Sequence, residues 1–394
     1  MTETHDPIRF VTDLRDHLAR HDKPISFLFG AGTSCAVRER NPAGNTECHP
    51  LIPAILPLTE KCKEHVAGLG DGFKTAWDTL VSECPTGRGH PNVEDILSKV
   101  RMKREAMGAG DKLCGLDKAG MTTLEAEITK TIASTVNPPE DKFPEQMPHD
   151  QLARWVKNVS RGYPLEIFTP NYDLLIERSL ERAFIPVFDG FVGSYRPFFH
   201  VDCVEVESLM PGPEWVRLWK IHGSVNWSLT KTESGLRVYR GEITDQPVVI
   251  MPSHLKYDEP RKQPYLALLD RLGRVLDRDD SLLITCGYSF ADQHINALIF
   301  GVLESRERAN VVALQFDSLD ETQPAVQFAT RVPRLLVAGP GHAVIRGALR
   351  PWNCTKPQGS DPVGGSVKYP KEGEVSMTLG DFNAFCTFLS TMGR

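Results

Sequence analysis

The chain has 394 residues, of which 41% are hydrophobic and 24% are charged, a balance that is ordinary for a globular protein. Its length allows two or three domain-sized units, or one large α/β domain with an inserted module. A net charge of −6 gives no overall attraction to nucleic acid or to an anionic membrane. Direct nucleic-acid contact stays open, because Arg101, Lys103 and Arg104 are candidates for a local basic groove.

No apolar run approaches the roughly 20 residues needed to cross a bilayer, and the first residues lack the basic and apolar blocks of a signal peptide. Nine cysteines are scattered along the chain without a Cys-x-x-Cys pair. Because a zinc ribbon grips its metal with closely spaced thiolates, this spacing argues against a zinc site and against a disulfide scaffold. We therefore expect a cytoplasmic protein with reduced thiols and no bound metal.

The first part of the chain is predicted to be mostly helical. Apolar residues at helical spacing indicate a helix over 8–20, and the apolar run at 25–29 indicates a buried strand. From about 54 to 134 the pattern is again helical, with Asn92 suited to an N-cap. Prolines between 138 and 148 then predict a non-helical connector.

The second part alternates strands with helices. This alternation implies a mostly parallel sheet that helices cover on both faces. Residues 351–375, rich in Pro, Gly and Ser, predict a loop or flexible arm, and a closing helix is predicted at 379–389. Strands are predicted at 165–169, 185–188, 215–221, 247–251, 281–286 and 311–316, and helices at about 172–183, 264–277 and 292–305.

The strand at 25–29 runs into a glycine-rich turn. Glycines at this point let a phosphate approach the backbone amides at the start of a helix. Cys35 stands where the dinucleotide fingerprint needs a third glycine, and no clear second strand follows, so an ordinary Rossmann dehydrogenase is disfavoured. A nucleotide-binding turn and a plain tight turn both remain open. The turn consists of Gly30, Ala31, Gly32, Thr33 and Ser34.

Polar residues also follow the strand at 165–169, and in open α/β sheets ligands lie at this edge. Asn171 offers an amide to a ribose hydroxyl or an ordered water, and Asp173 offers a carboxylate to an amide or hydroxyl. Both residue types also cap helices well, so either residue is alternatively the N-cap of the next helix.

Two further strand ends carry candidate residues. His222 follows the strand at 215–221 and is placed to act as a base near neutral pH, although a single histidine is more often structural. After the strand at 281–286, Gly287 and Ser289 are candidates for contact with a phosphate or an adenosine ribose. Asp292 is expected to cap the following helix.

Missing motifs exclude several common chemistries. The chain has no Gly-x-x-x-x-Gly-Lys-[Ser/Thr] phosphate loop, so ATP hydrolysis is not expected. It also lacks the Gly-x-Ser-x-Gly elbow and the His-Glu-x-x-His helix, which disfavours the commonest hydrolases and metalloproteases.

Taken together, the motifs occur in the order seen in sirtuins. Their version resembles bacterial sirtuin-like NAD hydrolases of antiphage defence systems, and the segments 92–97 and 380–385 are also similar to that branch. The four motifs are Gly-Ala-Gly-Thr-Ser at 30–34, Asn-Tyr-Asp at 171–173, His-Gly-Ser at 222–224 and Gly-Tyr-Ser-Phe-Ala-Asp at 287–292.

The resemblance covers about 25–305 and the last helix, and it implies a sirtuin-type, Rossmann-like α/β fold. Residues 1–350 would form the NAD-binding catalytic domain, with a helical insertion at about 50–150. Residues 351–394 would form a C-terminal arm and the closing helix. The four-cysteine zinc module of deacylase sirtuins is missing, and the stretch after the glycines differs, so the resemblance implies NAD binding more firmly than deacylation.

The resemblance also implies roles for the site residues. His222 would act as base or acceptor at a ribose hydroxyl, and Asn171 would orient the ribose or an attacking water. Asp173 would lie near the nicotinamide amide. The turn 30–34, with Gly287 and Ser289, would hold the pyrophosphate and the adenosine side.

The function implied by the resemblance is hydrolysis of NAD to nicotinamide and ADP-ribose, which depletes the cell during phage infection. A homo-oligomer is expected, and a HerA-type hexameric ATPase is the first candidate partner. Two alternatives stay open: a protein deacylase or ADP-ribosyltransferase, and a non-catalytic subunit that senses NAD or ADP-ribose.

Overall fold

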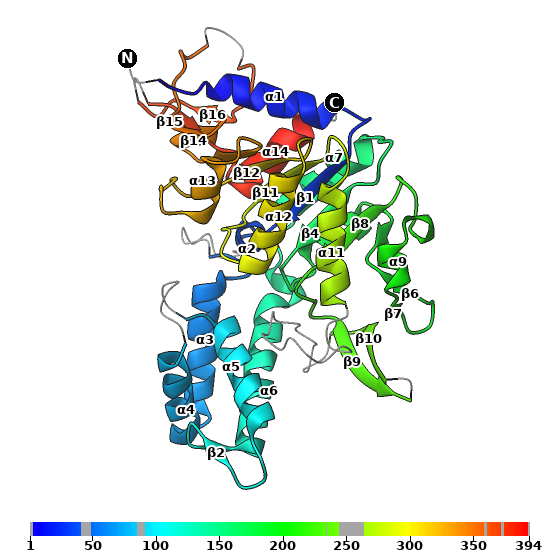
Figure 1. Cartoon of the computed structure of the whole chain (residues 1–394), viewed down its shortest axis with the longest axis vertical. Helices are drawn as coiled ribbons and strands as arrows, with labels where there is room; N and C mark the ends of the chain where they lie inside the picture. Colours follow the sequence, from blue (N-terminus) through cyan, green and yellow to red (C-terminus); the bar gives the residue numbers. More distant parts are fainter. Residues whose placement is uncertain are drawn as a thin grey trace.

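The computed structural model describes residues 3–40, 49–84, 91–233, 235–243, 264–357, 361–371 and 374–392, so the predicted strand at 247–251 lies outside the described residues. These residues form an α/β fold around a nine-stranded sheet (Figure 1). Across the sheet the strands are β15 (Ala348–Pro351), β14 (His342–Ile345), β13 (Leu335–Ala338), β12 (Asn310–Leu314), β11 (Leu282–Cys286), β1 (Ile25–Phe29), β4 (Glu166–Thr169), β8 (Val216–Lys220) and β5 (Val187–Phe188).

The sheet is mainly parallel. Every strand from β13 to β5 runs parallel to its neighbours, and β14 and β15 add an antiparallel edge. The predicted fold class, an α/β protein with a mostly parallel sheet, is confirmed.

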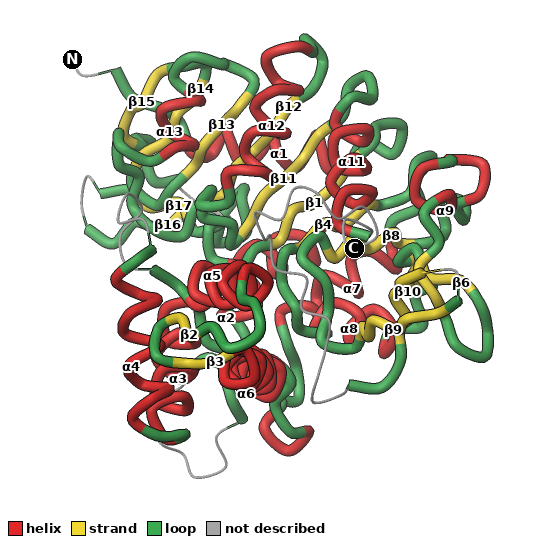
Figure 2. Tube along the Cα trace, turned by 60° about the horizontal axis from the view of Figure 1, so that its bottom comes forward, coloured by secondary structure: helices red, strands yellow, loops and turns green. Residues whose placement is uncertain are grey.

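Helices cover both faces of the sheet, which explains why its central strands are apolar on both sides (Figure 2). In β1, Phe27 and Phe29 pack into one core and Leu28 packs into the other, because successive side chains of a strand point to opposite faces. The first face is covered by α1 (Pro7–Ala19), α7 (Pro148–Asn158), α8 (Leu175–Arg182) and α14 (Phe382–Met392), and the second by α11 (Tyr265–Leu276), α12 (Gln293–Ser305) and α13 (Pro324–Ala329).

A helical module projects from the sheet and has a hydrophobic core of its own (Figure 1). Asn92 begins one of its helices with a capping box, in which its side chain accepts the N–H of Asp95 and Asp95 accepts the N–H of Asn92. The predicted N-cap at Asn92 is therefore confirmed. The module consists of α3 (Ile55–Gly68), α4 (Asp71–Ser82), α5 (Val93–Ala106), the hairpin β2 (Lys112–Leu113) and β3 (Leu116–Asp117), and α6 (Lys118–Val136).

Smaller elements complete the fold. The turn after β1 forms the short helix α2 (Ala31–Cys35), and a four-stranded sheet lies beside β8 and α11 (Figure 1). None of the helices within the described ranges is long and apolar enough to span a membrane. The remaining elements are η2 (Glu140–Lys142), β6 (Phe191–Val192), β7 (Phe198–Phe199), α9 (Asp202–Glu205), η3 (Glu207–Leu209), β9 (Trp227–Thr232), β10 (Gly235–Arg240), β16 (Val367–Lys368) and β17 (Ser376–Met377).

A helix that the sequence pattern did not predict follows the proline-rich connector. Helix α7 begins at Pro148, where a proline fits because the first turn of a helix needs no N–H donor. The Asp150 side chain accepts the backbone N–H of Met147 at 2.8 Å and fixes this start. The sequence pattern does not predict this helix, because a proline at this position is equally typical of a connector.

The closing helix and the arm before it pack on the rest of the chain. Phe382 lies edge-on to Phe29 at 5.2 Å between ring centroids, and Phe385 lies edge-on to Phe27 at 6.0 Å. In the predicted arm, Trp352 is buried, and its indole N–H donates to the Gly339 carbonyl at 2.8 Å. The closing helix therefore belongs to the core of the main sheet.

Candidate active site

Four neighbouring strands bring the predicted motifs to one edge of the sheet. Their order is β11, β1, β4 and β8, all parallel. The last residue of β1 pairs with the last residue of β11, and the last residue of β4 pairs with the last residue of β8. The turns that follow therefore lie together at the carboxyl edge, where ligands of open α/β sheets bind.

The glycine turns after β1 and β11 pack directly on each other. The Gly32 N–H donates to the Gly287 carbonyl at 3.0 Å. A Cβ on Gly30 would lie 2.4 Å from that same carbonyl oxygen, and Gly287 itself has φ +64°. These glycines are thus required by the close approach of two backbones, whatever the turn binds.

The predicted cofactor-binding residues of these turns differ in exposure. Ala31 and Ser289 are exposed, whereas Thr33 and Ser34 are buried. The Thr33 hydroxyl donates to the Gly30 carbonyl at 2.8 Å, so it closes the turn. The exposed residues lie at the surface of the carboxyl edge, and the buried ones hold the turn in shape.

Asn171 is held by the glycine turn. Its Nδ2 donates to the Gly30 carbonyl at 3.0 Å and to the Ser34 hydroxyl at 2.8 Å. Its Oδ1 accepts no hydrogen bond from any residue in the described ranges. The amide is therefore fixed through its donor side, and its acceptor is available to a hydroxyl or a water.

The Asp173 side chain holds Ser34, the residue to which Asn171 donates. Asp173 is 6% exposed, and its Oδ2 accepts the Ser34 hydroxyl at 2.6 Å. Its Oδ1 accepts the N–H of Leu175 in the first turn of α8 at 3.1 Å. The N-cap of α8 is Leu174, so neither Asn171 nor Asp173 is the N-cap that was considered as an alternative. The backbone carbonyl of Asp173 accepts a hydrogen bond from the buried ammonium of Lys220.

His222 is paired with a carboxylate, Asp292, for which only a capping role was expected. His222 lies two residues after β8 and is 4% exposed. Its Nε2 lies 3.0 Å from Asp292 Oδ2, an ion-pair distance without the alignment of a hydrogen bond. Asp292 also caps α12 as expected, because its Oδ1 accepts the N–H of His294 and of Ile295. Burial favours the neutral acid, but His222 and these N–H groups lower the pKa of Asp292.

Several buried polar atoms near the same edge have no hydrogen-bond partner within the described ranges. They come from the segment between β8 and β9, from β11, and from the first residue of α11, which starts at this edge because it leads into β11. Buried polar groups are normally hydrogen-bonded, so such atoms are expected where a polar ligand completes the site. They are His222 Nε2, Asn226 Oδ1, the Tyr265 hydroxyl and Thr285 Oγ1.

A pocket of about 320 Å³ opens where β12 and β13 end, farther along the same edge. Gln315, Phe316 and Asp381 are among the residues that line it. The Gln315 Nε2 donates to the Tyr288 carbonyl at 3.1 Å, which joins this pocket to the turn after β11. The pocket is large enough for a heterocyclic base, and it lies on the side where Gly287 and Ser289 are found.

No metal centre is found in the described part of the chain. No group of three or more His, Cys, Asp or Glu side chains there could hold a metal ion. The eight cysteines in that part are free thiols.

The three candidate residues for a basic groove are neutralised. Arg101 Nε lies 2.7 Å from Glu125, to which Arg104 is also paired, and Lys103 Nζ lies 2.8 Å from Glu83. These pairs lie within the helical module, so the residues present little unpaired positive charge.

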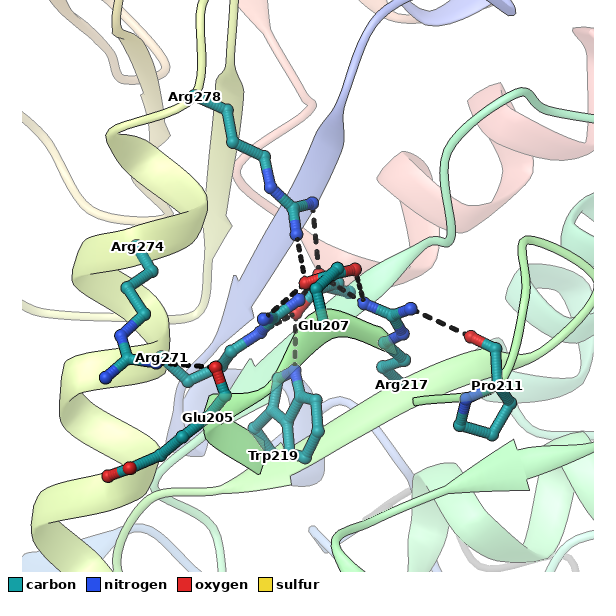
Figure 3. Close-up of polar contacts among 9 residues, drawn as sticks. Glu205, Glu207, Pro211, Arg217, Trp219, Arg271, Arg274 and Arg278 are labelled. Carbon is teal, nitrogen blue, oxygen red and sulfur yellow. Dashed lines mark hydrogen bonds and ion pairs between the residues drawn. The ribbon is translucent and has the colours of Figure 1, made fainter. Parts of the chain in front are cut away.

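Sequence reasoning missed a second polar cluster near the amino ends of β4 and β8. Glu166 is 1% exposed and accepts hydrogen bonds from the Trp219 indole at 2.7 Å and from Arg271 Nε at 2.8 Å. Figure 3 shows Arg271, Arg278 and Arg217 converging on the carboxylate of Glu207, which closes the cluster. Burial favours the neutral acid of Glu207, but Arg271 and Arg217 outweigh this effect and lower the pKa of Glu207 to about 2. The signal available in the sequence was a glutamate within an otherwise apolar strand.

Comparison with known protein families finds one similarity. Residues 165–331 match the family model described as the SIR2-like domain, which supports a Sir2-type family. SIR2-like domains use NAD as substrate, so the match indicates NAD-related activity and is compatible with an NAD-utilising enzyme. Asn171, His222 and Asp292 lie inside the matched range, and the turn 30–34 lies outside it. No curated protein matches the chain.

Proposed function

We propose that the protein hydrolyses NAD to nicotinamide and ADP-ribose. The observation that carries this proposal is the juxtaposition of Asn171 and His222 at one sheet edge, next to buried polar atoms that lack partners. The SIR2-like match supports NAD as the substrate.

Cleavage of the nicotinamide–ribose bond builds positive charge on the ribose, as in other glycosidic cleavages. His222 would accept the proton of a ribose hydroxyl and so make the ring more electron-rich. The buried anion of Asp292 would stabilise the protonated form of His222 and hold its ring. Asn171 would direct its free Oδ1 at a ribose hydroxyl or at the attacking water, which is a positioning role.

The adenosine half would lie along the rest of the carboxyl edge. The exposed Ser289 and the turn at Gly287 would contact the pyrophosphate or ribose, and the pocket at Gln315 would take the base. Asp173, whose two oxygens already accept hydrogen bonds, would keep Ser34 and Asn171 in place beside the nicotinamide.

Incubation of the purified chain with NAD tests this proposal. Equal amounts of free nicotinamide and ADP-ribose are the expected products. Nicotinamide release that requires an acyl-lysine peptide would instead identify a deacylase, and ADP-ribose attached to protein would identify a transferase. Binding of NAD without any product, measured by calorimetry, would identify a sensor subunit.

We also propose that the chain acts in antiphage defence as part of an oligomer, with a HerA-type hexameric ATPase as partner. The resemblance of 30–34, 92–97 and 380–385 to the defence branch supports this. Co-expression with such an ATPase, followed by measurement of complex mass and NAD turnover, tests it. A chain that stays monomeric, fully active and without a co-purifying partner would refute it.

A further inference from the structure

Tyr172 occupies an unusual place between Asn171 and Asp173. Its neighbours in sequence point into the carboxyl edge, but its own ring is buried in the core of the helical module. Val225, from the loop that carries His222, is buried in the same core. The module therefore packs directly on both segments that carry the proposed catalytic residues.

A hydrogen bond fixes the ring of Tyr172 to the module. The Tyr172 hydroxyl donates to Glu94 Oε1 at 2.7 Å. Burial, together with the negative charge of Glu94, raises the pKa of Tyr172, so the phenol stays protonated and remains the donor.

The backbone of Glu94 is hydrogen-bonded at the start of α5. It lies in the first turn of α5, where its N–H donates to the Asn92 side chain at 2.8 Å. The preceding N–H, of Val93, donates to the Thr59 hydroxyl of α3 at 2.9 Å. The start of α5 is thus fixed to a second helix of the module, and Glu94 follows any movement of that pair.

The backbone of Tyr172 links the two catalytic segments. Its carbonyl accepts the N–H of Val225 at 3.0 Å and faces the Ser224 hydroxyl at 3.4 Å. One residue therefore contacts the helical module through its hydroxyl and the His222 loop through its carbonyl, while its chain neighbours hold Ser34.

We infer that Tyr172 is a positioning residue through which the helical module sets the relative placement of Asn171 and His222. This inference rests on the proposed function for its kinetic consequence, but the structural link itself does not. A change in the module that moves α5 would alter turnover with no contact between the module and the substrate.

The test compares variants of the full chain by NAD turnover. Tyr172→Phe removes only the hydroxyl, and we expect kcat to fall about tenfold, in keeping with a hydrogen bond to a charged group, with little change in KM. Glu94→Gln keeps an acceptor for the Tyr172 hydroxyl and should retain most of the turnover. Glu94→Ala removes the acceptor and should lower kcat by the same factor as Tyr172→Phe. The double variant Tyr172→Phe with Glu94→Ala should be no slower than either single variant.

The matched control is Asp95→Ala. Asp95 lies next to Glu94 and caps the same helix through the Asn92 N–H at 3.1 Å, but no contact with Tyr172 is found in the described ranges. It should lower the melting temperature and leave kcat unchanged. An equal loss of kcat in this variant would overturn the inference, because general loosening of α5 would then be sufficient.

Hydrogen–deuterium exchange tests the link independently of NAD cleavage. In Tyr172→Phe, peptides covering 169–175 and 222–226 should exchange faster than in the parent chain, and in Asp95→Ala they should not. Exchange at the parental rate in Tyr172→Phe would overturn the inference. If the parent chain releases no nicotinamide, the proposed function fails, and the exchange measurement alone decides whether the link exists.

Discussion

Two buried polar clusters lie on the same pair of strands, β4 and β8, and they differ in how completely they are paired. At the amino ends, Glu166 accepts hydrogen bonds on both oxygens from arginines and a tryptophan. At the carboxyl ends, Asn171 keeps a free acceptor, and His222 Nε2 has an ion-pair neighbour but no hydrogen bond within the described part of the chain. In the first cluster every carboxylate oxygen is paired within the protein, although Arg217 Nε has no hydrogen-bond partner within the described ranges. In the second cluster an amide oxygen and a histidine nitrogen lack hydrogen bonds within those ranges and are open to a ligand.

The difference matters because a buried polar group costs free energy unless it is paired. The arginines around the Glu166 carboxylate offset the cost of burying it. Removal of either partner would leave the charge of the other uncompensated. His222 and the Asn171 amide still have atoms that can form hydrogen bonds with a substrate. Pairing therefore separates residues that hold this sheet together from residues that are proposed to act on NAD.

The largest effect is expected at the open cluster. His222→Ala should lower NAD turnover at least about 10³-fold, because general-base groups contribute on the order of 10²–10⁴-fold. Its melting temperature should stay close to that of the parent chain. His200→Ala is the matched control, since His200 Nδ1 is also buried without a partner within the described ranges but lies beside β7 in the small sheet. Near-native nicotinamide release by His222→Ala would show that His222 is not catalytic.

The closed cluster should respond in stability. Arg271→Met removes two hydrogen bonds to Glu166 and one to Glu207, so the free energy of unfolding should fall by about 3–5 kcal/mol. Below the unfolding transition, kcat and KM for NAD should be unchanged. Arg308→Met serves as control, because its ion pairs with Asp279 and Asp280 are exposed and screened by solvent, so their loss should change the free energy of unfolding little. A loss of turnover in Arg271→Met without loss of stability would contradict the division between the clusters.

His149 tests whether a buried group without a hydrogen-bond partner contributes to the pH dependence of stability. Its Nδ1 has no partner within the described ranges, and its ring lies 4.9 Å from that of Phe382. Burial lowers its pKa from 6.5 to about 4, against the opposing charges of Asp173 and Asp150. The unfolded chain therefore binds more protons between these values, and stability should fall as the pH drops through this window, by roughly 3 kcal/mol from this group.

Urea unfolding at pH 7 and pH 4.5 measures this contribution. His149→Leu removes the titrating group, so the difference in unfolding free energy between the two pH values should be smaller in the variant. Turnover at pH 7 should change little. An unchanged pH dependence in His149→Leu would show that His149 is not the buried group responsible.

The smallest effect is expected at Asp292, whose side chain both caps α12 and lies beside His222. Asparagine caps helices about as well as aspartate, so Asp292→Asn should keep the melting temperature while it removes the charge beside His222. We expect kcat to fall about tenfold at unchanged KM, which corresponds to about 1.4 kcal/mol. Asp292→Ala should show the same kinetic loss and, in addition, lose about 1 kcal/mol of stability with the cap. Full turnover in Asp292→Asn would show that Asp292 acts only as a helix cap.

The sequence by itself determined the elements that have strong local signals. Apolar runs located β1, β4, β8 and β11, and the alternation of strands with helices predicted the mainly parallel sheet. Because parallel strands end at a common edge, the positions of Asn171 and His222, each two residues after its strand, also predicted that both would lie at that edge. Asn92 was predictable as a cap because capping depends on a few adjacent residues.

Only the tertiary structure decided which residues pair across long separations in the chain. Glu166 meets Arg271, His222 meets Asp292, and Tyr172 meets Glu94, and no local pattern encodes these contacts. The same holds for the glycine turns, whose need for glycine comes from a second backbone pressed against them. Local propensity fixes where a strand or helix begins, but the choice of partner depends on strand order and on packing. These are properties of the folded chain as a whole.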